Sequence, residues 1–99
     1  MNIKISSLHF KADKKLEDFI NEKLTKLEKL HDAIMGVDVM LKLENTDKPE
    51  NKIVELRMKI KGNDLISEKS AKSFEEATDL AIDALKRQLQ KNKEKERNN

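Results

Sequence analysis

The residues of this chain that could do chemistry are mostly cations, and many of them gather toward its C-terminal end. The segment 86–97, KRQLQKNKEKER, contains two acids, Glu94 and Glu96, and six basic residues: Lys86, Arg87, Lys91, Lys93, Lys95 and Arg97. The last fourteen residues therefore carry a net charge of +4, while the whole chain carries +2 and residues 1–85 carry −2. Because a local block of positive charge attracts phosphate, this segment predicts a phosphate-rich partner.

A second group of cations, Lys15, Lys26 and Lys29, falls on one flank of the first predicted helix. Taken alone, such a group is usually only a solvated helix face, with Glu22 placed to pair with Lys26 four residues later. Lys23 falls within the apolar stripe of the same helix and has two interpretations. Its stem packs while its amine reaches water, or its amine points out between the helices toward a ligand.

The chain offers little for catalysis. His9 and His31 lie in different segments, and there is no cysteine. Asp79 and Asp83 share a helix face, but acids four residues apart on an exposed helix are usually solubilising, and no third metal ligand is visible. No phosphate-binding glycine loop, nucleophile elbow or H-x-x-x-H pattern occurs. We therefore expect a protein that is not an enzyme and has no cofactor, no metal and no small-molecule substrate.

The aromatic residues bear on which nucleic acid could bind. There are three Phe and neither Tyr nor Trp, and Phe19 and Phe74 fall on predicted apolar stripes. Base stacking needs exposed aromatic side chains. The composition therefore favours recognition of folded RNA through its shape and backbone. Charge alone leaves open that the C-terminal lysines only make the chain soluble.

Length and composition limit the architecture. Ninety-nine residues form one domain with a modest core, and 40% of the residues are charged. There is no run of eighteen apolar residues, and the N-terminus lacks the apolar centre of a signal peptide. We expect a cytoplasmic protein without membrane contact that is monomeric when free.

Alternating apolar residues predict the strands. A period of two indicates strands over 2–8, 37–44 and 52–61, and a weaker pattern indicates an edge strand over 64–71. The segment 45–51 holds the only Pro and no apolar residue, so it is predicted to be a loop. Gly62 and Asn63 match a two-residue hairpin turn with glycine first.

Two helices are predicted, each with one apolar stripe. The first begins at the N-cap Asp13 and runs to about His31 or Ile34, with Gly36 ending this unit; its stripe is Leu16, Phe19, Ile20, Leu24, Leu27, Leu30 and Ile34. The second opens with the capping-box pattern Ser73-x-x-Glu76, and its stripe is Phe74, Ala77, Ala81, Ile82, Ala84, Leu85 and Leu89.

The element order predicts an α/β (α+β) fold. In β-α-β-β-β-α order, the strand–helix–strand unit favours parallel strands, and the later strands are joined as hairpins. Two helices with one apolar stripe each must cover one face of a four-stranded mixed sheet, which gives a two-layer sandwich. We expect a single domain over 1–89 and a basic tail over 90–99.

The two helices and the second strand also resemble a known family. In the first helix and second strand the resemblance rests on Leu16, Lys23, Leu24, Lys26-Leu27-Glu28, Asp32, Ile34 and VDVMLKLE over 37–44. In the second helix it rests on Ser73-Phe74, Ala77, Asp79, Ile82-Asp83, Leu85, Arg87-Gln88-Leu89, Lys91, Lys93 and Lys95. On these residues the chain is similar to the short ribosome hibernation-promoting factors and the related ribosome-associated inhibitor of bacteria.

The resemblance implies a fold like that of a double-stranded-RNA-binding domain. It also implies binding to the small ribosomal subunit between head and body, where the paths of messenger RNA and of transfer RNA in the A and P sites would be blocked. Translation would then be inhibited in idle ribosomes during stress. The residues that the resemblance places on ribosomal RNA are Lys23, Lys26, Lys29, Lys86, Arg87, Lys91, Lys93 and Lys95.

The chain departs from the family pattern at two places, and two alternative functions stay open. Glu75 follows Phe74 where many members carry an aromatic residue, and Ser67 and Lys69 stand where members have small residues. The chain ends at Asn99, so the further domain by which long members pair two ribosomes is not expected here. The alternatives are a general double-stranded-RNA-binding module and a protein-interaction domain that modulates a sigma factor.

Overall fold

The computed structural model describes residues 2–97 and the side chains of residues 2–92. Its elements are β1 (Asn2–Leu8), α1 (Lys14–Leu30), β2 (Ile34–Leu43), β3 (Lys52–Ile60), β4 (Asn63–Ala71) and α2 (Phe74–Arg97). The four strands form one sheet in the order β1-β2-β3-β4, with β1 and β2 parallel and the other neighbours antiparallel. The predicted order, the mixed sheet and the edge position of β4 are therefore confirmed.

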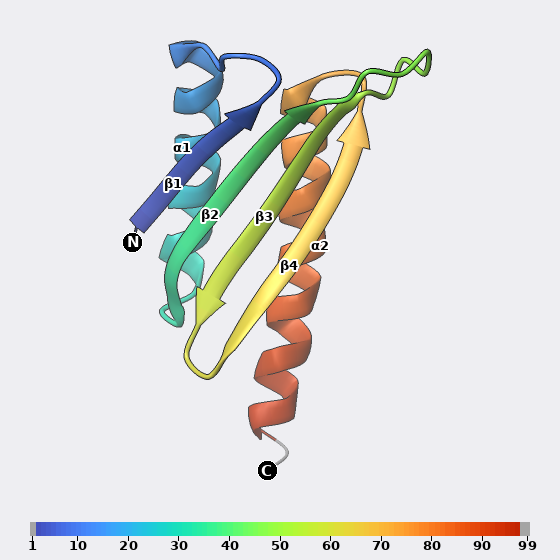
Figure 1. The fold of residues 1–99 in the computed structure, drawn as a ribbon. Helices are drawn as coiled ribbons and strands as arrows, with labels where there is room; N and C mark the ends of the chain where they lie inside the picture. The colour runs from blue at the N-terminus through green and yellow to red at the C-terminus, as the bar shows by residue number, and fades with distance from the viewer. Residues whose placement is uncertain (1, 98–99) are drawn as a thin grey trace.

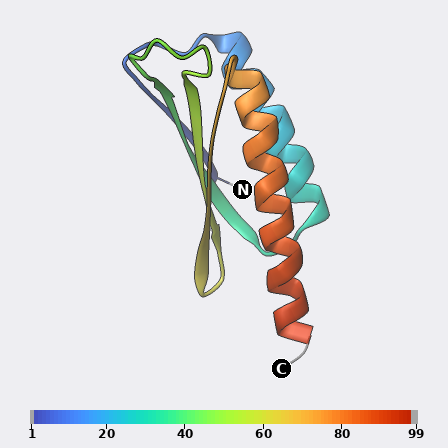
Figure 2. The ribbon, with the colours of Figure 1, turned by 90° about the vertical axis from the view of Figure 1, so that its right-hand side faces the viewer.

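Both helices cover the same face of the sheet, so the protein has two layers (Figure 2). They run in the same direction, from the end that carries the β2–β3 loop toward the β3–β4 hairpin (Figure 1). The core lies between the layers and is almost fully closed to solvent; it includes Ile20, Leu24 and Leu27 of α1, Val39 and Leu41 of β2, Leu56 and Met58 of β3, and Leu85 of α2. Burying each of these larger side chains contributes about 1.5–3 kcal/mol.

The two helix starts follow the local sequence. Asp13 lies in extended backbone before α1, and its Oδ1 accepts a hydrogen bond of 2.8 Å from the Leu16 amide. The Ser73 Oγ accepts one of 3.1 Å from the Glu76 amide. Each cap satisfies an amide that the first helical turn leaves without a backbone partner. The predicted N-caps are therefore confirmed.

The boundary between α1 and β2 differs from the prediction. The helix ends at Leu30, which is 65% exposed, and Ile34 is the first residue of β2. The strand therefore begins before Gly36, and the pairing with β3 shifts register between Ile34 and Gly36. Apolar spacing misled the prediction, because Ile34 is buried by the strand and occupies a position that would also continue the helical stripe.

Gly36 was predicted to end the first helical segment, but it lies within β2, at a position where a residue without a side chain is needed. It pairs with Asn2 of β1, and a Cβ atom built at Gly36 would lie 3.0 Å from the backbone oxygen of Asn2. The glycine thus allows the parallel strand to approach closely at the point where the register of β2 against β3 shifts.

The hairpin turn and the aromatic residues also need correction. Ile60 pairs with Asn63, so Lys61 and Gly62 form the turn, and Gly62 has a φ of 81° in the second position rather than the first. Phe19 and Phe74, which were predicted to be core residues, are only partly buried. Phe74 instead stacks on Phe10 with ring centroids 4.6 Å apart, and this joins the β1–α1 connection to the start of α2.

We expect Gly36→Ala to lower the free energy of unfolding by about 1–3 kcal/mol, because β1 must move to accept the added methyl group. Urea denaturation measures this change. Met35→Ala is the matched control, since Met35 is the neighbouring residue and is 65% exposed; its effect should stay within about 0.5 kcal/mol. Equal stability of Gly36→Ala and wild type would contradict the close approach of β1.

Candidate nucleic-acid interface

Charge is distributed unevenly along both helices. Residues 74–83 of α2 contain four acids and no base, whereas residues 84–97 contain six bases and two acids. In α1, three lysines and one acid occupy residues 23–30. Because the helices run in the same direction, both basic halves lie toward the β3–β4 hairpin, and α2 extends past that hairpin (Figures 1 and 2). We call these two segments, 23–30 and 84–97, the basic end of the helix layer.

A groove of about 380 Å³ runs between the helices where the basic end begins. Leu27, Leu30 and Ile82 give it an apolar portion. Its charged lining consists of Lys23 and Lys26 from α1 and Asp79, Asp83 and Lys86 from α2. The groove thus brings together three of the residues predicted to contact RNA, from two helices about sixty positions apart in the chain.

The structure places the Lys23 amine near an aromatic ring and a carboxylate. Its Nζ lies over the Phe19 ring, 5.4 Å from the ring centroid. Its amine points between the helices, where Nζ lies 3.5 Å from Asp79 Oδ1. The two side chains are 41% and 52% exposed, so solvent screens the pair and it contributes little stability, on the order of 0–1 kcal/mol.

Lys26 is also close to a carboxylate. Its Nζ lies 3.5 Å from Glu22 Oε1, the partner that spacing predicted, and both side chains are more than two-thirds exposed. Lys86 is exposed on α2. Exposed ion pairs of this kind are weak, so a phosphate group can replace the carboxylate at little cost.

The remaining predicted residues are not part of the groove. Lys29, Arg87 and Lys91 are exposed but do not line it. Lys93 and Lys95 belong to α2 by backbone, and their side chains lie outside those that the structure describes. The segment 90–99, predicted to be a tail, therefore begins as a continuation of α2, which extends the basic end beyond the sheet.

Sequence reasoning missed two contacts that position the interface. Asp79 was interpreted as a solubilising acid, yet it connects α2 to Lys23 of α1. Gln88 Nε2 donates a hydrogen bond of 2.8 Å to the backbone oxygen of Ile66 on the edge strand β4. The second contact fixes the turn of α2 that carries Arg87, and it satisfies a carbonyl at the sheet edge. Sequence spacing gives no signal for either contact, because the partners are far apart in the chain.

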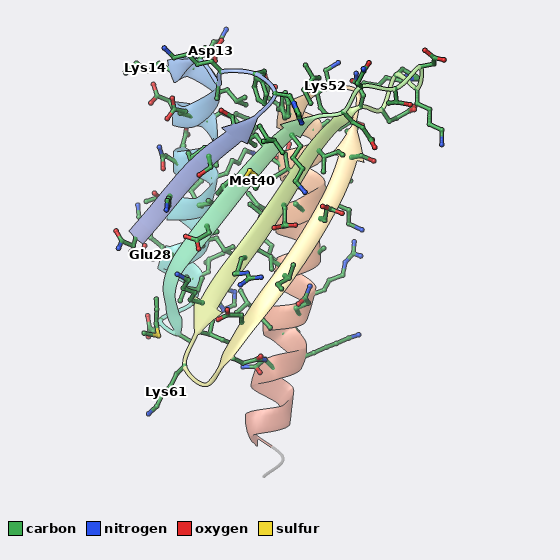
Figure 3. The ribbon with its side chains drawn as sticks, in the orientation of Figure 1. Asp13, Lys14, Glu28, Met40, Lys52 and Lys61 are labelled. Atoms are coloured by element: carbon green, nitrogen blue, oxygen red, sulfur yellow. The ribbon has the colours of Figure 1, made fainter. Side chains whose placement is uncertain are left out.

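The open face of the sheet is a poor site for phosphate because its charges are balanced. Lys59 Nζ lies 3.4 Å from Asp38 Oδ2, and Lys42 Nζ lies 3.7 Å from Glu68 Oε1. Met40 adds an apolar side chain between these pairs (Figure 3). The local excess of positive charge lies instead at the basic end, where residues 23–30 carry +2 and residues 84–97 carry +4.

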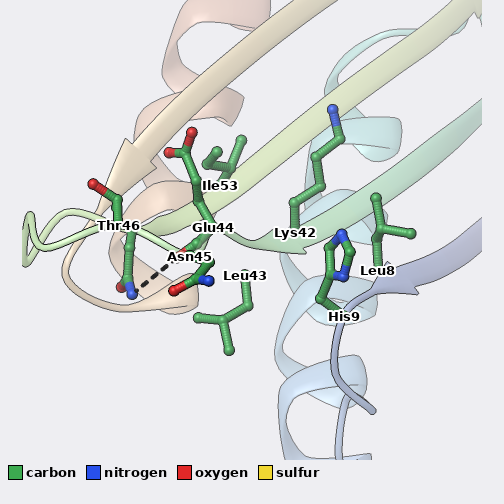
Figure 4. Close-up of a pocket in the computed structure, with 9 residues that line it drawn as sticks. Leu8, His9, Lys42, Leu43, Glu44, Asn45, Thr46 and Ile53 are labelled. Atoms are coloured by element: carbon green, nitrogen blue, oxygen red, sulfur yellow. Dashed lines mark hydrogen bonds between the residues drawn. The ribbon is translucent and has the colours of Figure 1, made fainter.

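A larger cavity, of about 690 Å³, lies at the other end of the sheet, between the end of β1 and the β2–β3 loop (Figure 4). Its lining is mixed, with Leu8, His9, Lys42 and Glu44 among its residues. Asn51 closes the loop by donating a 3.4 Å hydrogen bond to the backbone oxygen of Glu44. One lysine beside one glutamate gives this cavity no net attraction for phosphate, so the groove between the helices is the better candidate.

Other kinds of site find no support in the part of the chain that the structure describes. Within it, no group of three or more His, Asp or Glu residues is placed to hold a metal ion. Among the described helices, none is both long enough and apolar enough to cross a membrane.

Comparisons with known proteins identify the family of this chain. A family model described as "Sigma 54 modulation protein / S30EA ribosomal protein" matches residues 3–97. The chain belongs to this family. Its relatives include the ribosome hibernation promoting factors of Pseudomonas putida and Azotobacter vinelandii. Each is 32% identical over 96 residues, which is 97% of this chain and 90% or 86% of the relative.

Two solved structures have the family fold. A ribosomal subunit interface protein from Coxiella burnetii superposes with a TM-score of 0.83 at 20% identity, covering 94% of this chain and 98% of that one. The N-terminal domain of Thermus thermophilus Protein Y gives a TM-score of 0.78 at 23% identity, with coverage of 92% and 98%. At these identities the likeness establishes the fold.

We expect Gln88→Ala to lower the free energy of unfolding by about 0.5–1.5 kcal/mol, since it removes the hydrogen bond to β4. Chemical denaturation measures this loss. Gln90→Ala is the matched control, because Gln90 is exposed on the same helix, and it should change stability by less than about 0.5 kcal/mol. If the two variants were equally stable, the contact between α2 and β4 would have no role in holding the helix.

Proposed function

We propose that this protein is a cytoplasmic ribosome hibernation factor. It binds the decoding channel of the small ribosomal subunit and sterically blocks messenger and transfer RNA, which holds idle ribosomes inactive. The basic end of the helix layer is the surface that binds ribosomal RNA. Membership of the family supports the link to ribosome hibernation, and the groove that unites Lys23, Lys26 and Lys86 is the observation that supports this surface.

The chemistry of the surface suits binding without catalysis. Lysine amines neutralise phosphates and release the counterions that surround RNA, which supplies affinity that depends on salt. All three Phe rings are partly buried. Phe10 and Phe74 stack on each other and Lys23 Nζ lies over Phe19, which leaves little aromatic surface for stacking unpaired bases. Such a surface fits the backbone of folded RNA, and a rigid domain seated on it excludes other RNA by its volume.

The distribution of positive charge also favours one orientation. Because α2 extends past the β3–β4 hairpin, its last turns can enter a space that the sheet cannot (Figure 1). The charge-balanced open face of the sheet then points away from the RNA. The protein therefore approaches RNA with the C-terminal halves of both helices.

The proposal predicts that purified protein sediments with isolated small subunits and not with large subunits. Initiator transfer RNA bound beforehand should prevent this association, because both occupy the decoding channel. Sucrose-cushion sedimentation followed by immunoblotting measures both results. Equal binding to any duplex RNA would instead identify a general double-stranded-RNA-binding module. Binding to neither RNA nor subunits would leave a protein-interaction domain.

We also expect a characteristic salt dependence. If about five cations meet phosphates, the logarithm of the affinity should fall with the logarithm of salt with a slope of roughly −4. Replacing Lys26 and Lys86 by Gln should reduce the slope by about one per lysine. Lys11→Gln with Lys48→Gln is the matched control, because both lysines are exposed and it removes equal charge from the β1–α1 connection and the β2–β3 loop, away from the basic end. A slope near zero, or the same slope for both pairs, would contradict the proposed surface.

A further inference from the structure

The basic end is not uniformly positive, because two carboxylates line its groove. Asp79 lies about two turns and Asp83 about one turn before Lys86 on α2, and both line the groove together with Lys23 and Lys26. They are the last acids before the basic half of α2 begins. A protein that only needed to attract phosphate would gain affinity by lacking them, since like charges repel.

The position of Asp79 gives it a direct effect on a predicted phosphate ligand. Its Oδ1 lies 3.5 Å from Lys23 Nζ, on the opposite helix. A phosphate that approaches Lys23 therefore also approaches a carboxylate. With 52% of its side chain exposed, Asp79 is available to the RNA as well as to Lys23.

Carboxylates and phosphates make opposite demands on an RNA surface. An ionised carboxylate only accepts hydrogen bonds, so it binds the 2′-hydroxyl of ribose and the amino groups of bases. It repels the phosphate oxygens that the neighbouring lysines attract. A groove in which lysines lie beside carboxylates therefore favours RNA that places phosphates near the lysines and hydroxyl or amino donors near the carboxylates.

We propose that Asp79 and Asp83 determine specificity: they weaken binding to generic duplex RNA and accept hydrogen bonds from ribose or base donors of the cognate RNA. For the identity of the cognate RNA, this inference rests on the proposed function. The predicted effect on generic duplex RNA does not depend on that function. The acids thus lower total affinity for RNA while raising the ratio of cognate to generic binding.

The test uses Asp79→Asn, Asp83→Asn and the double variant of the full chain. Asn keeps the size and one acceptor oxygen of Asp but removes its charge. The probes are a mixed-sequence RNA duplex of about 16 base pairs, similar in length to what a double-stranded-RNA-binding domain spans, and isolated small ribosomal subunits. Dissociation constants are measured for both probes at several salt concentrations.

Asp18→Asn is the matched control. Asp18 pairs with Lys14 on α1, with Lys14 Nζ 3.3 Å from Asp18 Oδ2, and it does not line the groove. Asp18→Asn changes the net charge by the same amount as each groove variant, and it also removes the carboxylate partner of a lysine. Any effect it shares with Asp79→Asn reflects overall charge and not the groove.

We expect each groove variant to bind duplex RNA roughly fivefold more tightly than wild type, as expected for losing one like charge near a phosphate in water. Affinity for small subunits should stay equal or fall, so the ratio of the two affinities drops. The salt slope on duplex RNA should steepen for Asp79→Asn by about 0.7–0.9, because Lys23 becomes available to one more phosphate.

Two results would overturn the inference. One is a gain on duplex RNA no greater than that of Asp18→Asn. The other is an unchanged ratio of subunit to duplex affinity. Asp83→Asn keeps the Lys23–Asp79 pair, so it tests the same idea if Asp79→Asn proves unstable. If wild type fails to bind subunits, the proposed function fails, while the duplex measurements still decide whether the two acids repel generic RNA.

Discussion

The structure depends on the burial of one face of the sheet under two helices. The fully buried apolar side chains of β2 and β3 point to this face, and the apolar stripes of α1 and α2 cover it. The buried apolar residues that the structure describes form a single cluster. Two helices on one face of a narrow sheet must lie beside each other, and the groove between them follows from this packing.

The electrostatics of that groove combine attraction with restraint. Lys23, Lys26 and Lys86 come together because the helices run in the same direction and lie side by side. Two of these lysines already lie near carboxylates, at 3.5 Å in each case. Because these ion pairs are exposed to solvent, they are weak, and each lysine can exchange its carboxylate partner for another anion. In the proposed function, phosphates would replace these carboxylates, and Asp79 and Asp83 would limit which arrangements of phosphate the groove binds.

The differences between the expected and observed fold have local physical causes. Ile34 satisfies both a helical stripe and a buried strand, so only its pairing with Ile60 decides between them. By sequence, Gly36 looks like a residue that ends a helix. In the structure it needs to lack a side chain, because a Cβ atom there would lie 3.0 Å from the backbone oxygen of Asn2 in β1. Gly62 fits the turn in either position by sequence, and the pairing of Ile60 with Asn63 places it second. In each case a partner distant in the chain chose between local options.

The sequence by itself determined the element order, the mixed two-layer class, the caps at Asp13 and Ser73, and the concentration of cations toward the end of the second helix. These features depend on periodicity and on neighbours within a few residues. Only the tertiary structure decided that Lys23 meets Asp79 and that Gln88 binds the edge of β4. A helical stripe identifies the face that is buried, but the two flanks of that stripe remain equivalent until a neighbouring helix or strand occupies one of them.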